Sequence, residues 1–288
     1  MARHKQHNNL DPEEVRKKLN DFFIEDNIQE DITTLATQTT NQNVQAVFLA
    51  KENLYFSGKE IIIQGFSDCQ IIRIENDGEY ISKGQSIAVL QGSIQTILSK
   101  ERVVLNLLQR LSGITSKTKA LTKITKPYNI ELLDTRKTTP GLRMFEKFAV
   151  CVGGGTNHRY SLKDSIMIKD NHLMGLEKRN DILEVTKKLY KTYTDIDLEI
   201  EVDTKEQLDL ALESSATSIL LDNFSPEQLK NIIPYIRNHT IGNNKYIEIS
   251  GGITETTLTH YCIKGANGIS MGCLTHNIQS KDISLDIT

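Results

Sequence analysis

Basic side chains are concentrated in one stretch of a chain whose formal net charge is −3. Between residues 136 and 169 there are seven Lys or Arg residues and only two acidic residues. A local cationic cluster in an acidic chain is typical of a site for a small anion, whereas nucleic acid and anionic membranes attract broader positive fields. A solvated basic surface is the alternative. The cluster consists of Arg136, Lys137, Arg143, Lys147, Arg159, Lys163 and Lys169, with the titratable His158 beside Arg159.

Two carboxylates stand at the ends of strand-like segments in the following part of the chain. Glu201 lies in LEIEV, and Asp222 ends SILLD. Carboxylates near a cationic site can hold Mg²⁺ against a phosphorylated ligand or stabilise a developing positive charge. Residues at such positions can also cap the helix that follows, and Asp203 and Asn223 are alternative candidates for that purpose. Glu201 and Asp222 are therefore candidate metal ligands.

Two glycine-containing turns follow the last two strand candidates. Backbone N–H groups at a turn between a strand and a helix can bind phosphate, and α/β barrels commonly bind phosphate after their last strands. Simple tight turns are the alternative. The residues are Ser250, Gly251 and Gly252 in the first turn, and Ser270, Met271 and Gly272 in the second.

A zinc site is conceivable from residue types near the C-terminus, but the spacing of the four residues fits no standard zinc finger. These residues are His260, Cys262, Cys273 and His276.

From residue 130 onward, strand candidates alternate with helical segments, which predicts a parallel sheet built from βα units. Six strand candidates are fewer than the eight of a complete barrel, so a short or open α/β barrel competes with a doubly wound sheet. The barrel is favoured because polar residues stand near the carboxyl end of most strands, and a barrel brings all these ends to one mouth. The strand candidates are IELLD, SIMIK, LEIEV, SILLD, YIEIS and GISMG.

The chain before residue 125 has an α+β pattern. We expect an N-terminal domain at 1–125 with a bridging helix, a catalytic barrel domain at 126–274, and a C-terminal segment at 275–288 that is a candidate to pack back on the N-terminal domain. Residues 1–9 are expected to be a flexible extension. The N-terminal candidates are a helix at DPEEVRKKLNDFFIED, strands at VQAVFLA, EIIIQGF, QIIRIEN and SIAVLQG, and a helix at SKERVVLNLLQRLSGITSKTKALTKIT.

The composition of the chain indicates its expected cellular location and the class of its partners. The four cysteines form no CxxC pair, which fits a reducing compartment, and the cytoplasm is the expected location. The chain contains no apolar run of about 20 residues, so no membrane span is expected. The predicted partners are small molecules, with neither nucleic acid nor a membrane among them.

A resemblance to a known family is carried by the segments ERVVLNLLQRLSGI, ELLDTRKTTPGLRMFEKFAVCVGGGTNHRYSLKDSIMIKDNH, IEVD, LLDNFSPEQL, ISGGIT and GISMGCLTH. They resemble quinolinate phosphoribosyltransferase, and the similarity extends from about residue 30 to the C-terminus. The resemblance implies an N-terminal α+β sandwich followed by a short, roughly six-stranded α/β barrel, in a homodimer or an assembly of dimers. It implies the synthesis of nicotinate mononucleotide, pyrophosphate and CO₂ from quinolinate and phosphoribosyl pyrophosphate with Mg²⁺, a step of NAD biosynthesis.

The resemblance also implies a role for each candidate residue. The expected quinolinate ligands are Arg136, His158, Arg159 and Lys169, with Arg102 donated by a second subunit so that active sites are shared. The expected ligands of phosphoribosyl pyrophosphate are Lys137, Glu201, Asp222 and the two turns at 250–252 and 270–272. Lys137, Lys169, Glu201 and Asp222 are the catalytic candidates, and Mg²⁺ is held by Glu201 and Asp222 or mainly by pyrophosphate.

Two other functions are weighed against this one. A paralogous protein linked to molybdenum transport shares the TRKTTPG segment, but IMIKDNH, which contains Lys169, argues against it. A phosphosugar-binding or regulatory barrel without catalysis would not need Lys137, Glu201 and Asp222 together with Lys169.

Overall fold

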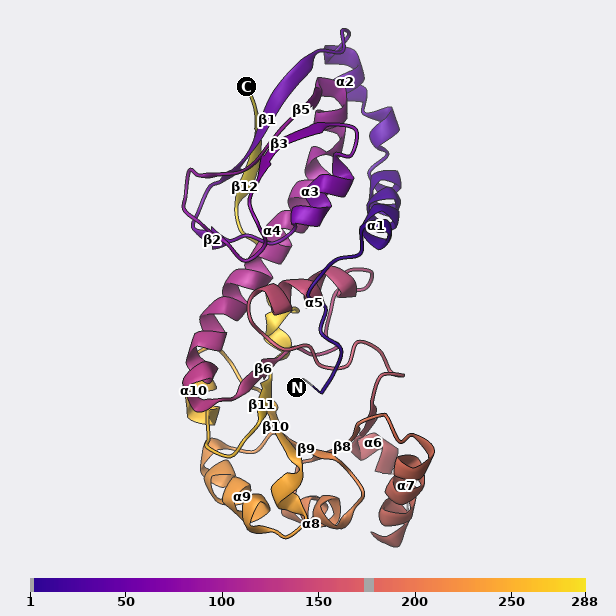
Figure 1. The fold of residues 1–288 in the computed structure, drawn as a ribbon, viewed down its shortest axis with the longest axis vertical. Coiled ribbons are helices and arrows are strands. Elements are labelled where there is room, and N and C mark those ends of the chain that lie inside the picture. The colour runs from indigo at the N-terminus through magenta and orange to yellow at the C-terminus, as the bar shows by residue number, and fades with distance from the viewer. Residues whose placement is uncertain (1–2, 174–178) are drawn as a thin grey trace. The chain divides into compact units, whose positions relative to one another are not determined.

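The computed structural model describes residues 3–173 and 179–288, and the chain forms two compact units (Figure 1). The barrel unit contains the start of the chain through Gln6, together with Ala120–Thr138 and Gly155–His276. The sheet unit contains His7–Lys119, Thr139–Gly154 and Asn277–Thr288. The chain thus passes from the sheet unit into the barrel unit between Gly154 and Gly155. This division separates the predicted basic cluster, because Arg143 and Lys147 belong to the sheet unit.

The sheet unit is built on four antiparallel strands in the order β12-β1-β5-β3. β12 pairs with β1 from Ala46 opposite Ile287 to Ala50 opposite Ile283, so the end of the chain is part of this sheet. The strands are β1 (Asn43–Ala50), β3 (Gln70–Ile74), β5 (Ser86–Ser93) and β12 (Ile283–Ile287), and a separate pair is formed by β2 (Leu54–Tyr55) and β4 (Tyr80–Ile81). The helices are α1 (Pro12–Glu25), α2 (Ile32–Thr37), α3 (Lys59–Gly65), α4 (Ile94–Thr125, which continues into the barrel unit) and α5 (Arg143–Val152).

One predicted strand, EIIIQGF, is wrong, because this segment forms the helix α3. The carboxylate of Asp77 accepts hydrogen bonds from the backbone N–H groups of Gly58 at 2.6 Å and Lys59 at 3.1 Å, and so caps the start of the helix. Ile61, Ile62 and Gly65 are its buried residues, which is a helical spacing. A short apolar run has no clear period of its own, so the cap contributed by Asp77 decides its structure.

The barrel unit contains six parallel strands in the order β6-β11-β10-β9-β8-β7, which confirms the predicted short α/β barrel. Among the described residues, β6 and β7 are the edges of the sheet and are not paired with each other. The strands are β6 (Glu131–Leu133), β7 (Ile166–Ile168), β8 (Leu198–Val202), β9 (Ser218–Asp222), β10 (Tyr246–Ser250) and β11 (Gly268–Ser270). The helices between or after them are α6 (Asp170–Leu173), α7 (Arg179–Thr192), α8 (Lys205–Glu213), α9 (Pro226–Asn238) and α10 (Leu258–Tyr261).

The two faces of this sheet carry different side chains. Residues that are paired in register point to the same face, and successive residues alternate between faces. One face is aliphatic, and α7 and α8 contact β8 on the helix side of the unit. The other face, here called the inner face, carries polar side chains in three register rows. They are Glu199, Ser218 and Tyr246 in the first row, Glu201, Glu248 and Glu131 in the second, and Asp222, Ser250 and Ser270 in the third.

A glycine on β11 makes room for a polar contact on the inner face. The hydroxyl of Tyr246 donates to the carboxylate of Glu131 at 2.6 Å, across the position of Gly268. A Cβ atom on Gly268 would lie 2.4 Å from that hydroxyl and 2.3 Å from Leu133, so a side chain could not be accommodated there. The small residue is therefore required for packing within the barrel.

Candidate active site

The carboxyl ends of neighbouring strands bring together a cation and two carboxylates. Lys169, directly after β7, forms an ion pair with Glu201 near the end of β8. Asp222 ends β9, which pairs with β8. Helix capping does not explain the two acids, because the side chains of Thr204 and Ser225 cap α8 and α9. The predicted caps Asp203 and Asn223 are wrong for the same reason.

Asp222 is at the centre of this group. Burial raises the pKa of its carboxyl group, while the nearby charges of Lys169 and Lys137 act in the opposite direction. A hydrogen bond with Ser250 also favours the ionised form, and the Asn223 amide donates to Asp222 at 2.8 Å. Two cations, a hydroxyl and an amide are thus arranged around one half-buried carboxylate at the mouth of the barrel.

Two guanidinium groups lie close enough to repel each other beside this carboxylate group. Burial lowers the pKa of Arg159, and the charge of Arg136 lowers it further, against the effect of Glu199 and Glu201. Arg159 donates to the backbone carbonyl of Ser165 at 3.0 Å. Among the described residues, the buried Nε of Arg136 has no hydrogen-bond partner. An anion bound between the two guanidinium groups would relieve both the repulsion and the unsatisfied donor.

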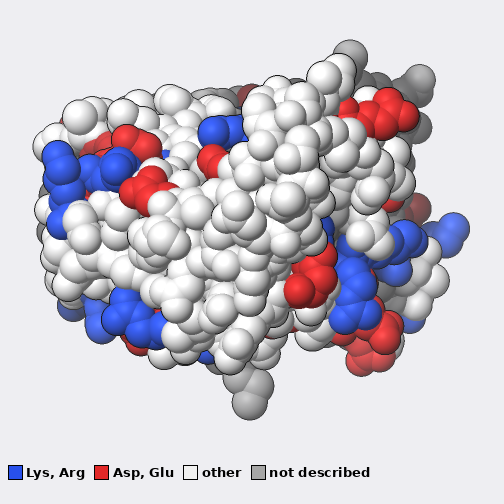
Figure 2. All heavy atoms as spheres, turned by 90° about the horizontal axis from the view of Figure 1, so that it is seen from above, with Lys and Arg blue, Asp and Glu red and all other residues white. Residues whose placement is uncertain are grey.

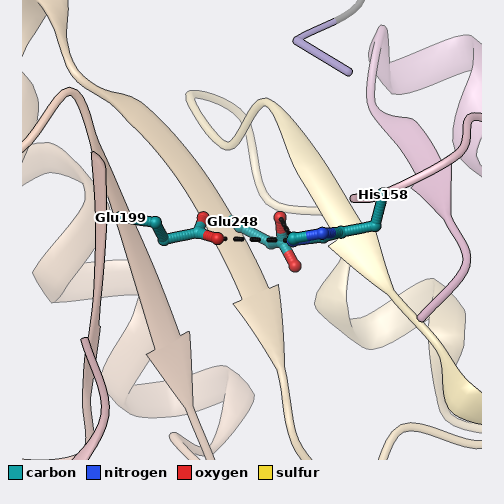
Figure 3. Close-up of side chains that lie close together, drawn as sticks. All are labelled: His158, Glu199 and Glu248. Atoms are coloured by element: carbon teal, nitrogen blue, oxygen red, sulfur yellow. Dashed lines mark ion pairs between the residues drawn. The ribbon is translucent and has the colours of Figure 1, made fainter. Parts of the chain in front are cut away.

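His158 lies deeper, on the inner face of the sheet (Figure 3). Its Nε2 is 3.3 Å from Glu199 Oε2 and 3.5 Å from Glu248 Oε2, and its Nδ1 accepts a hydrogen bond from the backbone N–H of Arg159 at 2.7 Å. Burial alone would lower the pKa of His158, but the charge of Glu248 and the hydrogen bond with Glu199 outweigh it and raise the pKa to about 9. The backbone N–H of Arg159 favours an unprotonated Nδ1, whereas the two glutamates favour the protonated, cationic ring, and in either form the Nε2 proton is the one that faces the glutamates.

Three residues that hold His158 were not among the candidates from sequence. Asp134 accepts hydrogen bonds from the backbone N–H of His158 at 2.8 Å and from the Asn157 amide at 2.6 Å. Glu199 and Glu248 are the other two, and both are fully buried. The alternation of acidic and aliphatic residues in LEIEV and YIEIS was the available signal, because it predicts carboxylates on one face of each strand.

The first glycine turn has a backbone that other residues would strain. Gly251 and Gly252 have φ angles of 96° and 61°. A Cβ atom on Gly251 would lie 2.3 Å from the side-chain oxygen of Asn223, whereas a Cβ atom on Gly252 would meet nothing within 4 Å. The turn is therefore closely packed on one side and open on the other, as expected where a ligand approaches the backbone.

The second glycine turn lies against Lys137. A Cβ atom on Gly272 would be 2.9 Å from Cδ of Lys137, and the hydroxyl of Thr275 donates to the Lys137 carbonyl at 2.7 Å. Ser270 and Met271, which precede Gly272, are buried. The positive charge of Lys137 also favours the ionised form of Asp222. Lys137 therefore links the turn at 270–272 with the carboxylates at the mouth of the barrel.

The remaining candidates lie elsewhere. Arg102 is on α4 of the sheet unit, where 61% of its side chain is exposed and its nearest acidic group is Glu101 at 3.8 Å. Among the described residues, the potential metal ligands that converge are His158, Glu199 and Glu248, not the four residues of the zinc alternative.

The surface and the helices add two observations about partners. On the face shown in Figure 2, the described Lys and Arg side chains lie interspersed with Asp and Glu side chains. In the described part of the chain, no helix combines the length and the apolar composition of a membrane span.

Comparison with known proteins identifies relatives over nearly the whole chain. The family model for the quinolinate phosphoribosyl transferase N-terminal domain matches residues 31–112, and the model for the C-terminal domain of the same family matches residues 114–286. A Bacillus subtilis protein named as a probable nicotinate-nucleotide pyrophosphorylase (carboxylating) is 42% identical over 280 residues, which cover 96% of this chain and 94% of that protein.

Two further relatives are similarly complete. A Nicotiana glauca protein named quinolinate phosphoribosyltransferase (decarboxylating) 2, mitochondrial, is 36% identical over 89% of this chain and 77% of that protein. The solved structure of the nicotinate-nucleotide pyrophosphorylase from Francisella tularensis has a TM-score of 0.90 at 30% identity and covers 99% of both chains. Sequence and fold therefore lead to the same group of proteins.

Proposed function

This chain belongs to the quinolinate phosphoribosyl transferase family, and we propose that it converts quinolinate and phosphoribosyl pyrophosphate into nicotinate mononucleotide, pyrophosphate and CO₂. The observation that carries the proposal is the close pair of Arg136 and Arg159, together with the buried Nε of Arg136, which has no hydrogen-bond partner among the described residues. Such a pair favours a ligand with two negative charges, and quinolinate has two adjacent carboxylates.

The proposed quinolinate site consists of Arg136, Arg159 and Lys169, with His158 behind Arg159, where the Arg159 N–H and the two glutamates already occupy its ring nitrogens. The two guanidinium groups can hold the ligand by paired hydrogen bonds, which set the orientation of the pyridine ring as well as its affinity. Lys169 forms an ion pair with Glu201. We propose that a carboxylate of quinolinate takes over Lys169, so that Glu201 becomes available to the second substrate.

The proposed site for phosphoribosyl pyrophosphate lies along the next strands. Lys137 and the turns at 250–252 and 270–272 supply a cation and backbone N–H groups for phosphate, and Glu201 and Asp222 face the ribose. In this proposal the anomeric carbon lies between the basic quinolinate site and the phosphate-binding turns. The two substrates can therefore be held with their reacting atoms in contact.

The carboxylates fit a Mg²⁺ ion in their chemistry. Glu201 and Asp222 provide oxygen ligands on adjacent strands, and Mg²⁺ is usually held by one or two carboxylates together with substrate phosphates. Glu201 and Asp222 would hold the ion, which when bound would neutralise charge on the pyrophosphate leaving group.

The side chains of the site account for the chemistry of the substrates. The pyridine nitrogen attacks the anomeric carbon while pyrophosphate leaves, and the developing positive charge on the ribose is stabilised by the nearby carboxylates of Glu201 and Asp222. Once the ring nitrogen is quaternary, it stabilises the carbanion left when CO₂ departs from the adjacent carbon. Loss of CO₂ therefore follows bond formation, and protonation of that carbon completes the product.

We also propose that the protein is a homodimer, or an assembly of dimers, with Arg102 donated to the active site of the partner subunit. Its exposed side chain on α4 is available to a partner. A cytoplasmic location is supported by the four cysteines, none of which forms a disulfide among the described residues.

The direct test is a CO₂-release assay with quinolinate labelled at the carboxylate next to the ring nitrogen. We expect label release and nicotinate mononucleotide in equal amounts, only when phosphoribosyl pyrophosphate is present. Release of label without the second substrate would contradict the proposed order of steps. No release with both substrates and Mg²⁺ would refute the function and favour a non-catalytic barrel.

Removal of divalent cations is expected to reduce turnover to below about 1% of its initial value, because pyrophosphate leaves poorly without charge neutralisation. The measurement is product formation after exhaustive chelation, with Mg²⁺ added back as the control. Full turnover in the chelated enzyme would overturn the roles of Glu201 and Asp222 as metal ligands.

A further inference from the structure

The first described residues of the chain are fixed within the barrel unit, contrary to the predicted flexible extension. Residues 3–6 are here called the N-terminal arm. The Arg3 side chain is only 10% exposed. It donates to Asp197 at 3.3 Å, to Glu199 at 3.1 Å and to the hydroxyl of Ser218 at 2.7 Å. The guanidinium group of Arg3 is thus held by three side chains that lie near the start of β8 and β9.

Arg3 enters the barrel at the end opposite to the proposed active site. Asp197 precedes β8, Ser218 is the first residue of β9, and Tyr246, whose ring lies 4.4 Å from the Arg3 guanidinium, is the first residue of β10. Glu201 and Asp222 are at the other end of β8 and β9. Arg3 is therefore not placed to touch substrate, and any effect on the reaction must pass through other side chains.

Two buried glutamates provide that connection. Glu199 and Glu248 are fully buried on the inner face, and Arg3 Nη1 is 3.1 Å from the first and 3.7 Å from the second. Glu199 itself lies between two cations, because its Oε1 is 3.1 Å from Arg3 Nη1 and its Oε2 is 3.3 Å from His158 Nε2. Carboxylates inside a protein need nearby cations, and Arg3 and His158 both lie within ion-pair distance of each of these two carboxylates.

The arm also contacts His158 and its neighbour directly. The ring of His4 stacks on the ring of His158, with 4.6 Å between centroids and 28° between planes. The Gln6 amide donates to the Asn157 carbonyl at 3.1 Å and accepts from the Asn157 N–H at 2.7 Å. His158 is therefore held by the stacked ring of His4 and by the two glutamates that Arg3 neutralises. The backbone of the preceding residue, Asn157, is held by Gln6.

We propose that the N-terminal arm is a positioning element of the quinolinate site, in which Arg3 and His4 fix the ring of His158 from the amino end of the barrel. The inference rests on the proposed function, because it takes His158 and the adjacent Arg159 as parts of the quinolinate site. In a variant that lacks Arg3, His158 would be the nearest cation to Glu199 and Glu248. We expect the changed charge to displace the His158 ring and the adjacent Arg159. Small displacements of groups that orient a substrate reduce binding and rate steeply.

The main test compares Arg3→Gln with Lys5→Gln. Both remove one positive charge from the arm, but the Lys5 side chain is exposed, so it is the matched control. We expect Arg3→Gln to raise the KM for quinolinate about 10-fold and to change the KM for phosphoribosyl pyrophosphate less than about 2-fold. Lys5→Gln should leave both values unchanged. Arg3→Lys, which keeps the charge, should recover part of the loss.

A readout without substrate separates this inference from the proposed function. The ¹⁵N signals of the His158 ring, assigned with a His158→Gln variant, should move in Arg3→Gln and not in Lys5→Gln. If wild-type protein does not turn over quinolinate, the proposed function fails, while the ring signals still decide whether the arm positions His158.

A second variant keeps the test valid if Arg3→Gln does not fold. His4→Ala removes the stacked ring and leaves the charges in place, and it should raise the KM for quinolinate several-fold with little change for phosphoribosyl pyrophosphate. Equal increases of the two KM values would overturn the proposal. So would a lower melting temperature with unchanged KM values and unchanged His158 signals, because that result describes a purely structural arm.

Discussion

Nicotinate is expected to be a substrate on the order of 10⁴-fold poorer in kcat/KM than quinolinate, because it lacks the carboxylate next to the ring nitrogen. With nicotinate bound, part of the cationic site formed by Arg136, Arg159 and Lys169 would be buried without a partner, and an unsatisfied buried charge is costly. Both acids release pyrophosphate if they react, so pyrophosphate release is the common measurement. Comparable kcat/KM values would contradict a site built for two carboxylates.

Substitutions in the basic stretch extend this test. Lys169→Ala should raise the KM for quinolinate more than the KM for phosphoribosyl pyrophosphate, since Lys169 is proposed to leave Glu201 for the quinolinate carboxylate. Lys163→Ala is the matched control, because Lys163 lies in the same stretch but its side chain is exposed. A similar effect of both substitutions would mean that general charge, rather than a specific contact, governs quinolinate binding.

Mixing two inactive variants is expected to restore activity if the active site is shared between subunits. Arg102→Ala and Lys169→Ala should each be nearly inactive as homodimers, because each of their sites lacks one ligand. In a mixed two-fold dimer, one site carries both defects and the other carries neither. With random exchange half of the dimers are mixed, so about a quarter of wild-type activity should return.

The matched control for this experiment is a mixture of Lys169→Ala with Arg136→Ala. Both residues belong to the barrel unit of one chain, so every site in a mixed dimer keeps one defect and no activity should return. Subunit exchange is verified with a tag on one variant. If tagged mixed dimers form and the Arg102→Ala mixture stays inactive, Arg102 does not act across the interface.

The sequence by itself determined the barrel and the residues at its mouth. Alternating strand and helix patterns after residue 130 predict a parallel sheet, and parallel strands gather their carboxyl ends at one edge. Lys169, Glu201 and Asp222 could therefore be found as polar residues at strand ends, before any contact was known. The structure brings these three together, as this local pattern requires.

Other features depended on contacts between distant parts of the chain. The segment EIIIQGF became α3 because Asp77 caps it from another segment. The positions of Arg143 and Lys147 in the sheet unit could not be read from a run of charge. In both cases the local sequence allowed more than one structure, and packing selected among them.

The N-terminal arm is the clearest case in which only the tertiary structure decided. Arg3 and Glu199 are separated by 196 positions, and nothing in the polar first nine residues has a period or a motif that predicts their contact. Glu199 and Glu248 alternate with aliphatic residues, which places each of them on one face of its strand but does not predict which cation neutralises them. Two buried carboxylates require a positive charge, and the fold determined that the start of the chain supplies it.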